Sequence, residues 1–189
     1  MVAPIQTPPQ IQHGARMTAD EFDRLPEHDG GFVELIEGVV VVAGGASVEH
    51  QRLIRRLFVY LNSIVTAGEW FTAPLTLTLE GNNRPEPDIF WIAPDMPVVY
   101  EQARVIGAPG LIIEILSPST GKLDKTTKFD VYERSGVKEY WNADPDYGVI
   151  EIYTLREGRY ARLGAYGEAD SFESPVLGVT IALNGIFPA

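Results

Sequence analysis

An apolar run from Leu111 to Leu116 is interrupted by a single acid, Glu114. β-Branched residues at this density are typical of a strand that is buried on both faces. An ionised carboxylate in such a strand is costly unless it is paired, hydrogen-bonded or bound to a metal ion. Glu114 is therefore either a member of a structural ion pair or a residue of a functional site.

The segment after this strand changes to helical spacing. After a break at Pro118, the pattern predicts a helix over Lys122–Ser135, with a glycine directly behind it as the stop signal. Asp124, Lys128 and Tyr132 recur every four residues within this helix. Residues four apart lie on one helical face, so an acid, a base and a phenol share that face.

The rest of the chain alternates between helical and strand-like patterns. A capping box formed by Thr18 and Glu21 predicts a short helix, and Ser47 is a good N-cap for a long amphipathic one. The expected elements, in chain order, are a helix over Ala19–Leu25, a strand or hairpin over Phe32–Ala43, a helix from Ser47 to Ala67, a strand over Trp70–Leu79, a strand opening at Asp88, a short helical piece over Val98–Val105, a strand over Glu139–Asn142, a hairpin of Val149–Leu155 with Arg159–Tyr166, and a last strand over Val176–Leu183.

Three further polar residues stand out in these elements. Glu34 lies between Val33 and Leu35 and is either an outward residue of an alternating strand or a site residue. His50 lies in the first turn of the long helix, on its core-facing side, where a histidine is commonly a hydrogen-bonded packing residue rather than a ligand or base. Asp88 follows a proline, which commonly marks only a turn, but here it opens an apolar strand.

Length and composition indicate one domain. The chain has 189 residues, is 45% hydrophobic, and shows no break in composition. We expect residues 17–189 to form this domain and residues 1–16, rich in proline and glutamine, to form a disordered arm. The chain has no cysteine, which excludes disulfides, thiolate metal sites and a cysteine nucleophile. With no apolar stretch long enough to span a membrane, we expect a cytoplasmic protein with no membrane partner.

The net charge of −11 is unfavourable for binding nucleic acid, since neutralising phosphates normally requires a basic surface. Two basic clusters nevertheless occur on predicted helices, Arg52 with Arg55 and Arg56, and Lys122 with Lys125 and Lys128. Each cluster is either a local anion-binding surface or simply a solvated helix face.

Asp88 and Glu114 suggest metal chemistry when they are taken together. On neighbouring strands they can share a divalent cation such as Mg²⁺, which takes oxygen ligands and keeps waters able to attack a phosphate. A lysine nearby can stabilise charge on phosphoryl oxygens and assist the attacking water.

Six motifs carry a resemblance to a known family. They are VELIEG from Val33, EHQ from Glu49, PEPDI from Pro85, IIEILSPST from Ile112, DKTTKFDVY from Asp124 and GVKEYWNADP from Gly136. With these motifs the sequence resembles the PD-(D/E)XK nuclease superfamily and, more closely, the Uma-type restriction endonuclease family. The resemblance spans roughly Thr18 to Tyr153.

The resemblance implies a mixed α/β fold with a restriction-endonuclease-like core, for which we expect a mixed central sheet flanked by helices. The strand patterns after Trp141 add a C-terminal β-hairpin extension to this core. It also implies phosphodiester hydrolysis in DNA with Mg²⁺ or Mn²⁺. Carried over by position, it makes Asp88 and Glu114 the metal ligands, Lys128 the catalytic lysine, Glu34 and His50 additional site residues, and Tyr132 and Asp124 supports of Lys128.

One departure from the superfamily concerns the lysine. The usual E-x-K spacing would place it at position 116, where this chain has Leu116. The lysine must then come from the following helix, whose long side chains can reach the same point. Lys122 and Lys125 are alternatives, but Lys128 is better aligned with its helical neighbours.

The sequence-based hypothesis is thus a metal-dependent DNA endonuclease, expected to form a homodimer because nucleases that cut two strands often pair. The main rival is a catalytically degenerate module that binds nucleic acid or a protein partner, which the acidic charge and Leu116 favour. A purely structural or assembly protein is the third interpretation.

Overall fold

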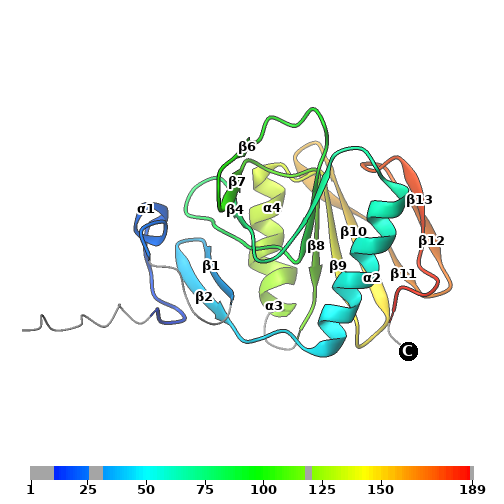
Figure 1. The fold of residues 1–189 in the computed structure, drawn as a ribbon, viewed down its shortest axis with the longest axis horizontal. Coiled ribbons are helices and arrows are strands. Elements are labelled where there is room, and N and C mark those ends of the chain that lie inside the picture. The colour runs from blue at the N-terminus through cyan, green and yellow to red at the C-terminus, as the bar shows by residue number, and fades with distance from the viewer. Residues whose placement is uncertain (1–10, 26–31, 118–120, 188–189) are drawn as a thin grey trace, which may run out of the picture.

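The structure is a computed structural model that describes residues 11–25, 32–117 and 121–187. Its centre is a six-stranded sheet with the strand order β11-β10-β9-β8-β5-β3 (Figure 1). Strands β8 and β9 are parallel, and the other neighbours are antiparallel, which confirms the expected mixed sheet. The bounds of these strands are β3 Glu69–Thr72, β5 Ile89–Ile92, β8 Leu111–Ile115, β9 Glu139–Asp144, β10 Val149–Arg156 and β11 Arg159–Gly167.

Helices cover both faces of this sheet (Figure 1). Helix α2, Val48–Ile64, packs its buried leucines against one face, together with Ile113 and Ile115 of β8. The opposite face is covered by three consecutive helical pieces, α3 Gly121–Leu123, the π-helix η1 Asp124–Lys128, and α4 Phe129–Ser135. Since strand residues alternate between faces, Ile112 and Glu114 point toward the second group of helices.

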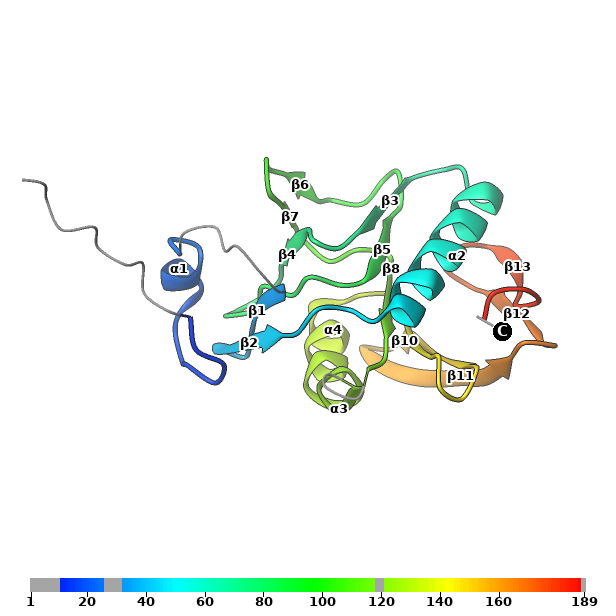
Figure 2. The ribbon, with the colours of Figure 1, turned by 60° about the horizontal axis from the view of Figure 1, so that its bottom comes forward.

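Smaller elements surround the core (Figure 2). A hairpin of β1 and β2 turns at Glu37 and Gly38, which both have positive φ. Helix α1 follows the capping box of Thr18 and Glu21 and packs against this hairpin. The bounds are α1 Ala19–Phe22, β1 Phe32–Ile36, β2 Val39–Ala43, then a three-stranded sheet of β4 Thr76–Thr78, β6 Val99–Tyr100 and β7 Arg104–Ile106, and a hairpin of β12 Ser171–Ser174 and β13 Val179–Ala182.

Two predicted elements differ from the structure. The helical piece over Val98–Val105 is wrong, because this segment forms β6 and β7, whose valines and Tyr100 pair in an antiparallel ladder. The strand over Trp70–Leu79 is two strands, β3 and β4, in different sheets on either side of Pro74. Strand β3 lies at the edge of the central sheet.

Strand β12 is not among the predicted elements, and the strand expected over Val176–Leu183 begins only at Val179; the remaining differences are in element boundaries. Helix α1 ends at Phe22 rather than Leu25, and α2 ends at Ile64 rather than Ala67 because Val65 is extended and buried. The helix predicted over Lys122–Ser135 is continuous, but it contains the π-helical turn η1. The hairpin of β10 and β11 completes the central sheet itself, so only β12 and β13 lie outside it as a C-terminal hairpin.

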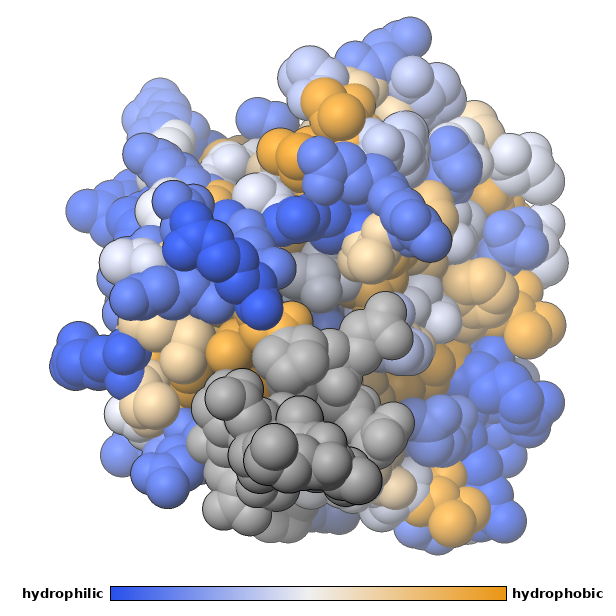
Figure 3. Space-filling view, turned by 60° about the vertical axis from the view of Figure 1, so that its left-hand side comes forward, coloured by the Kyte–Doolittle hydropathy of each residue, from blue (hydrophilic) through white to orange (hydrophobic). Residues whose placement is uncertain are grey.

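Part of the predicted N-terminal arm is attached to the hairpin. The backbone N–H of Gly14 donates to Val40 O, and the N–H of Val40 donates to Ala15 O. The face that carries the N-terminal elements is covered mostly by hydrophilic side chains, with separate apolar patches between them (Figure 3). In the described part of the chain, every helix is too short or too polar to cross a membrane.

Candidate active site

A cavity of about 400 Å³ opens between the β1–β2 hairpin, the start of α2, strands β5 and β8, and η1. We call it the acidic cavity. Its described lining contains seven acidic residues, and the basic side chains there are Lys128 and His50. The seven are Glu34, Glu49, Glu86, Asp88, Glu114, Asp124 and Asp146.

Lys128 lies at the floor of this cavity and is almost completely buried. Its Nζ lies 2.9 Å from Oε1 of Glu34, 3.0 Å from Oε1 of Glu114 and 3.4 Å from Oδ1 of Asp124. Burial alone lowers the pKa of a lysine, but the charges of these three acids outweigh burial and hold the pKa of Lys128 well above its usual value. The lysine therefore stays protonated across the physiological range.

Glu114 is placed by the alternation of strand β8, which turns its side chain toward η1 and α4. Its Oε1 accepts a hydrogen bond of 2.6 Å from the hydroxyl of Tyr132, in addition to the contact with Lys128. Burial raises the pKa of Glu114 well above its usual value, and the acids Asp124, Asp88 and Glu34 add to this, while Lys128 opposes it. Negative charge thus exceeds positive charge around this carboxyl group.

Asp88 and His50 form a second contact at the wall of the cavity. Oδ2 of Asp88 accepts a 2.7 Å hydrogen bond from the backbone N–H of Ile115 and lies 3.2 Å from Nε2 of His50. The same Nε2 lies 3.1 Å from the carbonyl oxygen of Ile115. Burial lowers the pKa of His50, but its contacts with Asp88 and Ile115 raise it, and the net shift is upward.

Glu86 is a cavity residue that the sequence analysis missed. Its backbone N–H donates to Oε1 of Glu34 at 2.8 Å, and its own Oε1 accepts from the hydroxyl of Thr76 at 3.1 Å. Burial raises the pKa of Glu86, and the charge of Glu34 adds to this. A signal was present, because extended residues two apart share a side and Glu86 stands two positions before Asp88.

The π-helical turn η1 coincides with the site. It begins at Asp124 and ends at Lys128, and both of these charged residues are buried. Single π-turns inside helices are rare and occur frequently at functional sites. Tyr132 follows one turn later in α4; it touches Glu114 from behind the cavity floor rather than lining the cavity.

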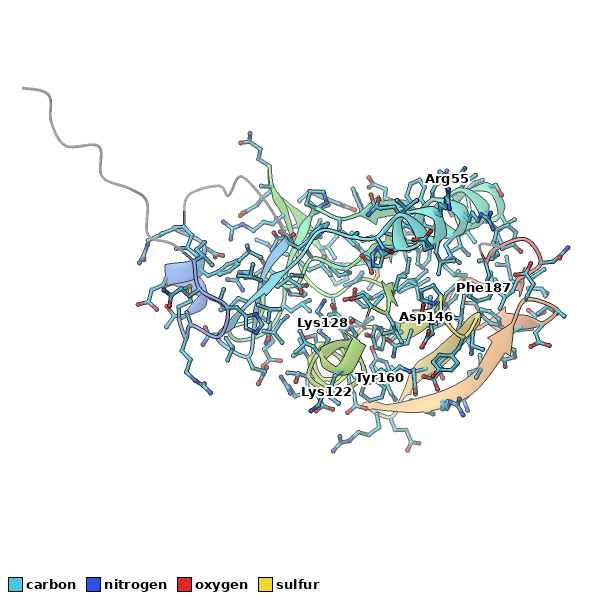
Figure 4. All side chains as sticks on the ribbon, turned by 90° about the horizontal axis from the view of Figure 1, so that it is seen from below. Arg55, Lys122, Lys128, Asp146, Tyr160 and Phe187 are labelled. Carbon is cyan, nitrogen blue, oxygen red and sulfur yellow. The ribbon has the colours of Figure 1, made fainter. Side chains whose placement is uncertain are left out.

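The other predicted basic residues lie outside the cavity. Lys125 is exposed and pairs with Glu151 at 3.2 Å, and Lys122 is exposed on the outer side of the helix from Lys128 (Figure 4). Arg56 donates to the carbonyl oxygens of Gly185 and Phe187 near the C-terminal end of the described chain. Arg52 pairs with Glu49, and Arg55 lies on α2 away from Lys128 (Figure 4).

The residues present fit a divalent cation by charge and donor type. Among the described residues, the side-chain contacts of Asp88 use Oδ2, and Oε2 of Glu114 accepts a long 3.5 Å hydrogen bond from the backbone N–H of Asp88. No three acidic or histidine side chains of the described ranges are grouped closely enough to form a complete ligand set. Mg²⁺, however, keeps several waters and commonly takes only one or two protein carboxylates.

Comparisons with known proteins identify relatives of this chain. Two Synechocystis proteins described as uncharacterized are similar to the chain. One, sll1609, is 26% identical over 151 residues, covering 78% of this chain and 82% of the relative. The other, slr1290, is 21% identical over 178 residues, covering 91% and 92%.

A solved structure shares the fold. The crystal structure of "a putative nuclease belonging to DUF820" from Anabaena variabilis ATCC 29413 matches with a TM-score of 0.74 at 23% identity, covering 90% of this chain and 97% of that one. The family model of Uma2, described as "Putative restriction endonuclease", matches residues 19–184. Restriction-endonuclease-like families generally use divalent metals. Because this match covers most of the chain, the protein belongs to the Uma2 family.

Proposed function

We propose that this protein is a metal-dependent endonuclease that hydrolyses phosphodiester bonds in DNA. The observation that carries the proposal is the 3.0 Å contact between Nζ of Lys128 and Oε1 of Glu114, on the floor of a cavity that also holds Asp88. The helical segment after β8 thus places a lysine beside Glu114, whereas the strand itself has Leu116 at the position where the superfamily usually has its lysine. Membership of the Uma2 family and the nuclease-like fold support the same function.

Asp88 and Glu114 would hold Mg²⁺ or Mn²⁺ in this proposal, since both present carboxylate oxygens to the acidic cavity. A bound cation of this kind supplies Lewis-acid stabilisation of charge on the phosphoryl oxygens. His50 positions Asp88 through the contact of its Nε2 with Oδ2. The same Oδ2 accepts a hydrogen bond from the backbone N–H of Ile115, so two contacts hold this oxygen in place.

Lys128 acts as a hydrogen-bond donor in this mechanism and not as a base. Its raised pKa keeps the ammonium charged, so it can orient an attacking water and stabilise negative charge on the phosphate. Glu34 and Glu114 fix the position of Nζ, and Tyr132 fixes Glu114 in turn. Glu34 and Tyr132 are therefore positioning residues, acting through Lys128 and Glu114.

The direct test is cleavage of supercoiled plasmid and of linear single-stranded DNA by the purified protein. With Mg²⁺ or Mn²⁺ we expect cutting that is abolished by EDTA and by Lys128→Met or Asp88→Asn. Lys138→Met is the matched control, because Lys138 is an exposed lysine that does not line the cavity. Cutting that survives both active-site substitutions would overturn the assignment.

A binding module without catalysis is the second candidate, and one observation favours it. Oε1 of Glu114 already accepts from both Lys128 and Tyr132, so part of the proposed ligand set is engaged within the protein. Calorimetric titration with Mn²⁺ discriminates the two candidates. The nuclease should bind Mn²⁺ and lose this affinity in Asp88→Asn, whereas a folded protein that binds DNA but no Mn²⁺ would be the binding module.

A cytoplasmic location and a homodimer complete the proposal. The absence of cysteine fits a reducing compartment, and paired subunits give each strand of a duplex its own active site. Light scattering on the purified protein tests the dimer directly, and a monomer at all concentrations would remove this part of the proposal.

A further inference from the structure

A groove of about 420 Å³ adjoins the acidic cavity, and Leu116, Ser117 and Asp146 line both. We call it the tyrosine groove, after Tyr147 on its rim. Its lining also contains Lys122 and Lys125. Because the groove and the acidic cavity share these residues, a linear polymer bound in the groove can continue directly into the cavity.

Tyr147 is 81% exposed, more than any other large apolar side chain of the described residues. It lies in the turn between β9 and β10, where Oδ1 of Asp144 accepts hydrogen bonds of 3.2 Å from the N–H groups of Asp146 and Tyr147. The turn is therefore held by hydrogen bonds from its backbone to the side chain of Asp144, while the exposed ring of Tyr147 gains little from burial. A ring presented in this way offers a face on which another planar group can stack.

Lysine is concentrated at this place. The chain contains four lysines, at positions 122, 125, 128 and 138, and three of them fall within seven consecutive residues. Lys128 points inward, whereas Lys122 and Lys125 are exposed and line the tyrosine groove. The pair of Lys125 with Glu151 is partly exposed and easily exchanged for another anion.

Charge and shape together indicate the ligand. In a chain of net charge −11, the lysines put positive charge beside a cavity lined by acids, where a phosphate backbone can be attracted. Asp144 also lines the groove, but its carboxylate is engaged in the turn, and Asp146 stands at the border with the acidic cavity. Lys122 and Lys125 are therefore the residues of the groove that can contact phosphates.

We propose that the tyrosine groove binds unpaired nucleotides of a DNA strand next to the bond that is cut. Lys122 and Lys125 contact the phosphates, and one base stacks on the ring of Tyr147. Base stacking on an aromatic side chain requires an open base face, which a single strand offers and the interior of a duplex does not. The inference rests on the proposed nuclease function and names its substrate class as single-stranded or locally unpaired DNA.

The test is fluorescence anisotropy with a labelled thymidine oligonucleotide and a blunt hairpin duplex, in EDTA so that no cleavage occurs. Tyr147→Ala should weaken single-strand binding about tenfold, while Tyr147→Phe keeps the ring and the affinity. Tyr100→Ala is the matched control, since Tyr100 is 50% exposed on β6, outside the groove lining. Equal affinity of Tyr147→Ala and wild type, or a preference for the duplex, overturns the proposal.

The lysines are tested through the salt dependence of the same binding. Log affinity falls with log salt, and removing one lysine–phosphate interaction should make this slope less steep by about 0.7. The double variant Lys122→Ala with Lys125→Ala should therefore show a shallower slope than the wild type. Lys138→Ala, the remaining exposed lysine, should leave the slope unchanged. An unchanged slope in the double variant would show that Lys122 and Lys125 do not contact the phosphates.

These outcomes separate the groove from the nuclease function. Binding through Tyr147 without any cleavage in Mg²⁺ or Mn²⁺ supports the groove and contradicts the nuclease. Cleavage by a protein whose single-strand affinity is unaffected by Tyr147→Ala supports the nuclease and overturns the groove.

Discussion

Nζ of Lys128 lies 3.0 Å from Oε1 of Glu114, and both side chains are almost completely excluded from solvent. Two further acids, Glu34 and Asp124, approach the same nitrogen. A single positive charge thus stabilises three buried carboxyl groups. This relationship makes the folding of the protein and its proposed chemistry depend on one lysine.

Lys128→Met should therefore destabilise the protein strongly. Removing one partner of a buried ion pair leaves the other charge uncompensated and typically costs about 3–5 kcal/mol. Urea unfolding at neutral pH should show this loss in the free energy of unfolding. Adding Glu114→Gln to Lys128→Met should restore part of the lost stability, because one of the acids left without its lysine partner is then removed.

The control for this experiment is Lys138→Met, since Lys138 is exposed and surface substitutions usually change stability by less than about 0.5 kcal/mol. If Lys128→Met unfolds at the same urea concentration as Lys138→Met, the buried ion pair does not stabilise the fold. The positions of Glu34 and Asp124 would then need another explanation.

Moving the lysine to the position usual in the superfamily tests whether only the location of its charge matters. Leu116 lines the acidic cavity at the end of the strand that carries Glu114. We expect Leu116→Lys to restore part of the metal-dependent cleavage in a Lys128→Met background, because a long side chain there can present its ammonium to the same cavity. Plasmid nicking with Mn²⁺ measures the recovery.

Leu116→Arg in the same background is the comparison variant, since it restores a positive charge as a planar guanidinium rather than a compact ammonium. Recovery with lysine and not with arginine would indicate that a compact ammonium is required. Failure of Leu116→Lys in a protein shown by circular dichroism to be folded would count against the idea that the lysine has moved.

Tyr132→Phe should have a milder effect than Lys128→Met. It removes the 2.6 Å hydrogen bond to Oε1 of Glu114 but leaves Lys128 as a donor to the same oxygen. A buried hydrogen bond contributes about 0.5–1.5 kcal/mol, so the free energy of unfolding should decrease by about this amount. Cleavage should slow without being lost, as expected of a positioning residue.

Tyr153→Phe is the matched control, because Tyr153 lies in the aromatic cluster around Phe129 and does not contact the acids of the cavity. A loss of cleavage in Tyr132→Phe as complete as that of Lys128→Met would assign the phenol a direct catalytic role. A full rate in Tyr132→Phe would show that it has no role in positioning Glu114.

Local periodicity explains what the sequence could predict. The four-residue spacing of Asp124, Lys128 and Tyr132 places them on one face, and all three contact the same acidic cluster or belong to it. The alternation of β8 places Glu114 opposite that face. These contacts depend on neighbours along one helix and one strand, where the period of the backbone determines direction.

Local periodicity does not predict contacts between segments that are distant in the sequence. Glu34 reaches the N–H of Glu86 across 52 positions, because the β1–β2 hairpin folds over the end of β5, and no local spacing encodes such a contact. The π-turn of η1 has the same residue types as an α-helical turn. Strands β6 and β7 are too short for their alternation to separate them from a helical piece.

Glu139 lies outside the lining of the acidic cavity, and its buried carboxyl group should make the stability of the fold depend on pH. Its carboxyl group is fully buried and accepts hydrogen bonds from Nε1 of Trp141 at 2.6 Å, from the hydroxyl of Ser174 at 2.9 and 3.0 Å, and from the N–H of Val176 at 3.2 Å. Burial raises the pKa of Glu139 above its ordinary value of 4.5, although these hydrogen bonds oppose the shift. The neutral carboxyl is thus the form that the fold prefers.

The sign of the pH dependence follows from this shift. Because the pKa in the folded protein lies above the unfolded value, the stability that Glu139 contributes is complete below pH 4.5 and is lost as pH rises through the folded pKa. Glu139→Gln removes this titration but places an amide N–H₂ against the donors of Trp141 or Val176, at a cost of about 1–3 kcal/mol. The deficit of the variant should therefore be largest near pH 4.5 and should narrow toward neutral pH. Urea unfolding across this range measures the difference, with the exposed Glu80→Gln as control. A deficit that stays constant or widens with pH would show that the folded protein prefers the ionised carboxylate at this position.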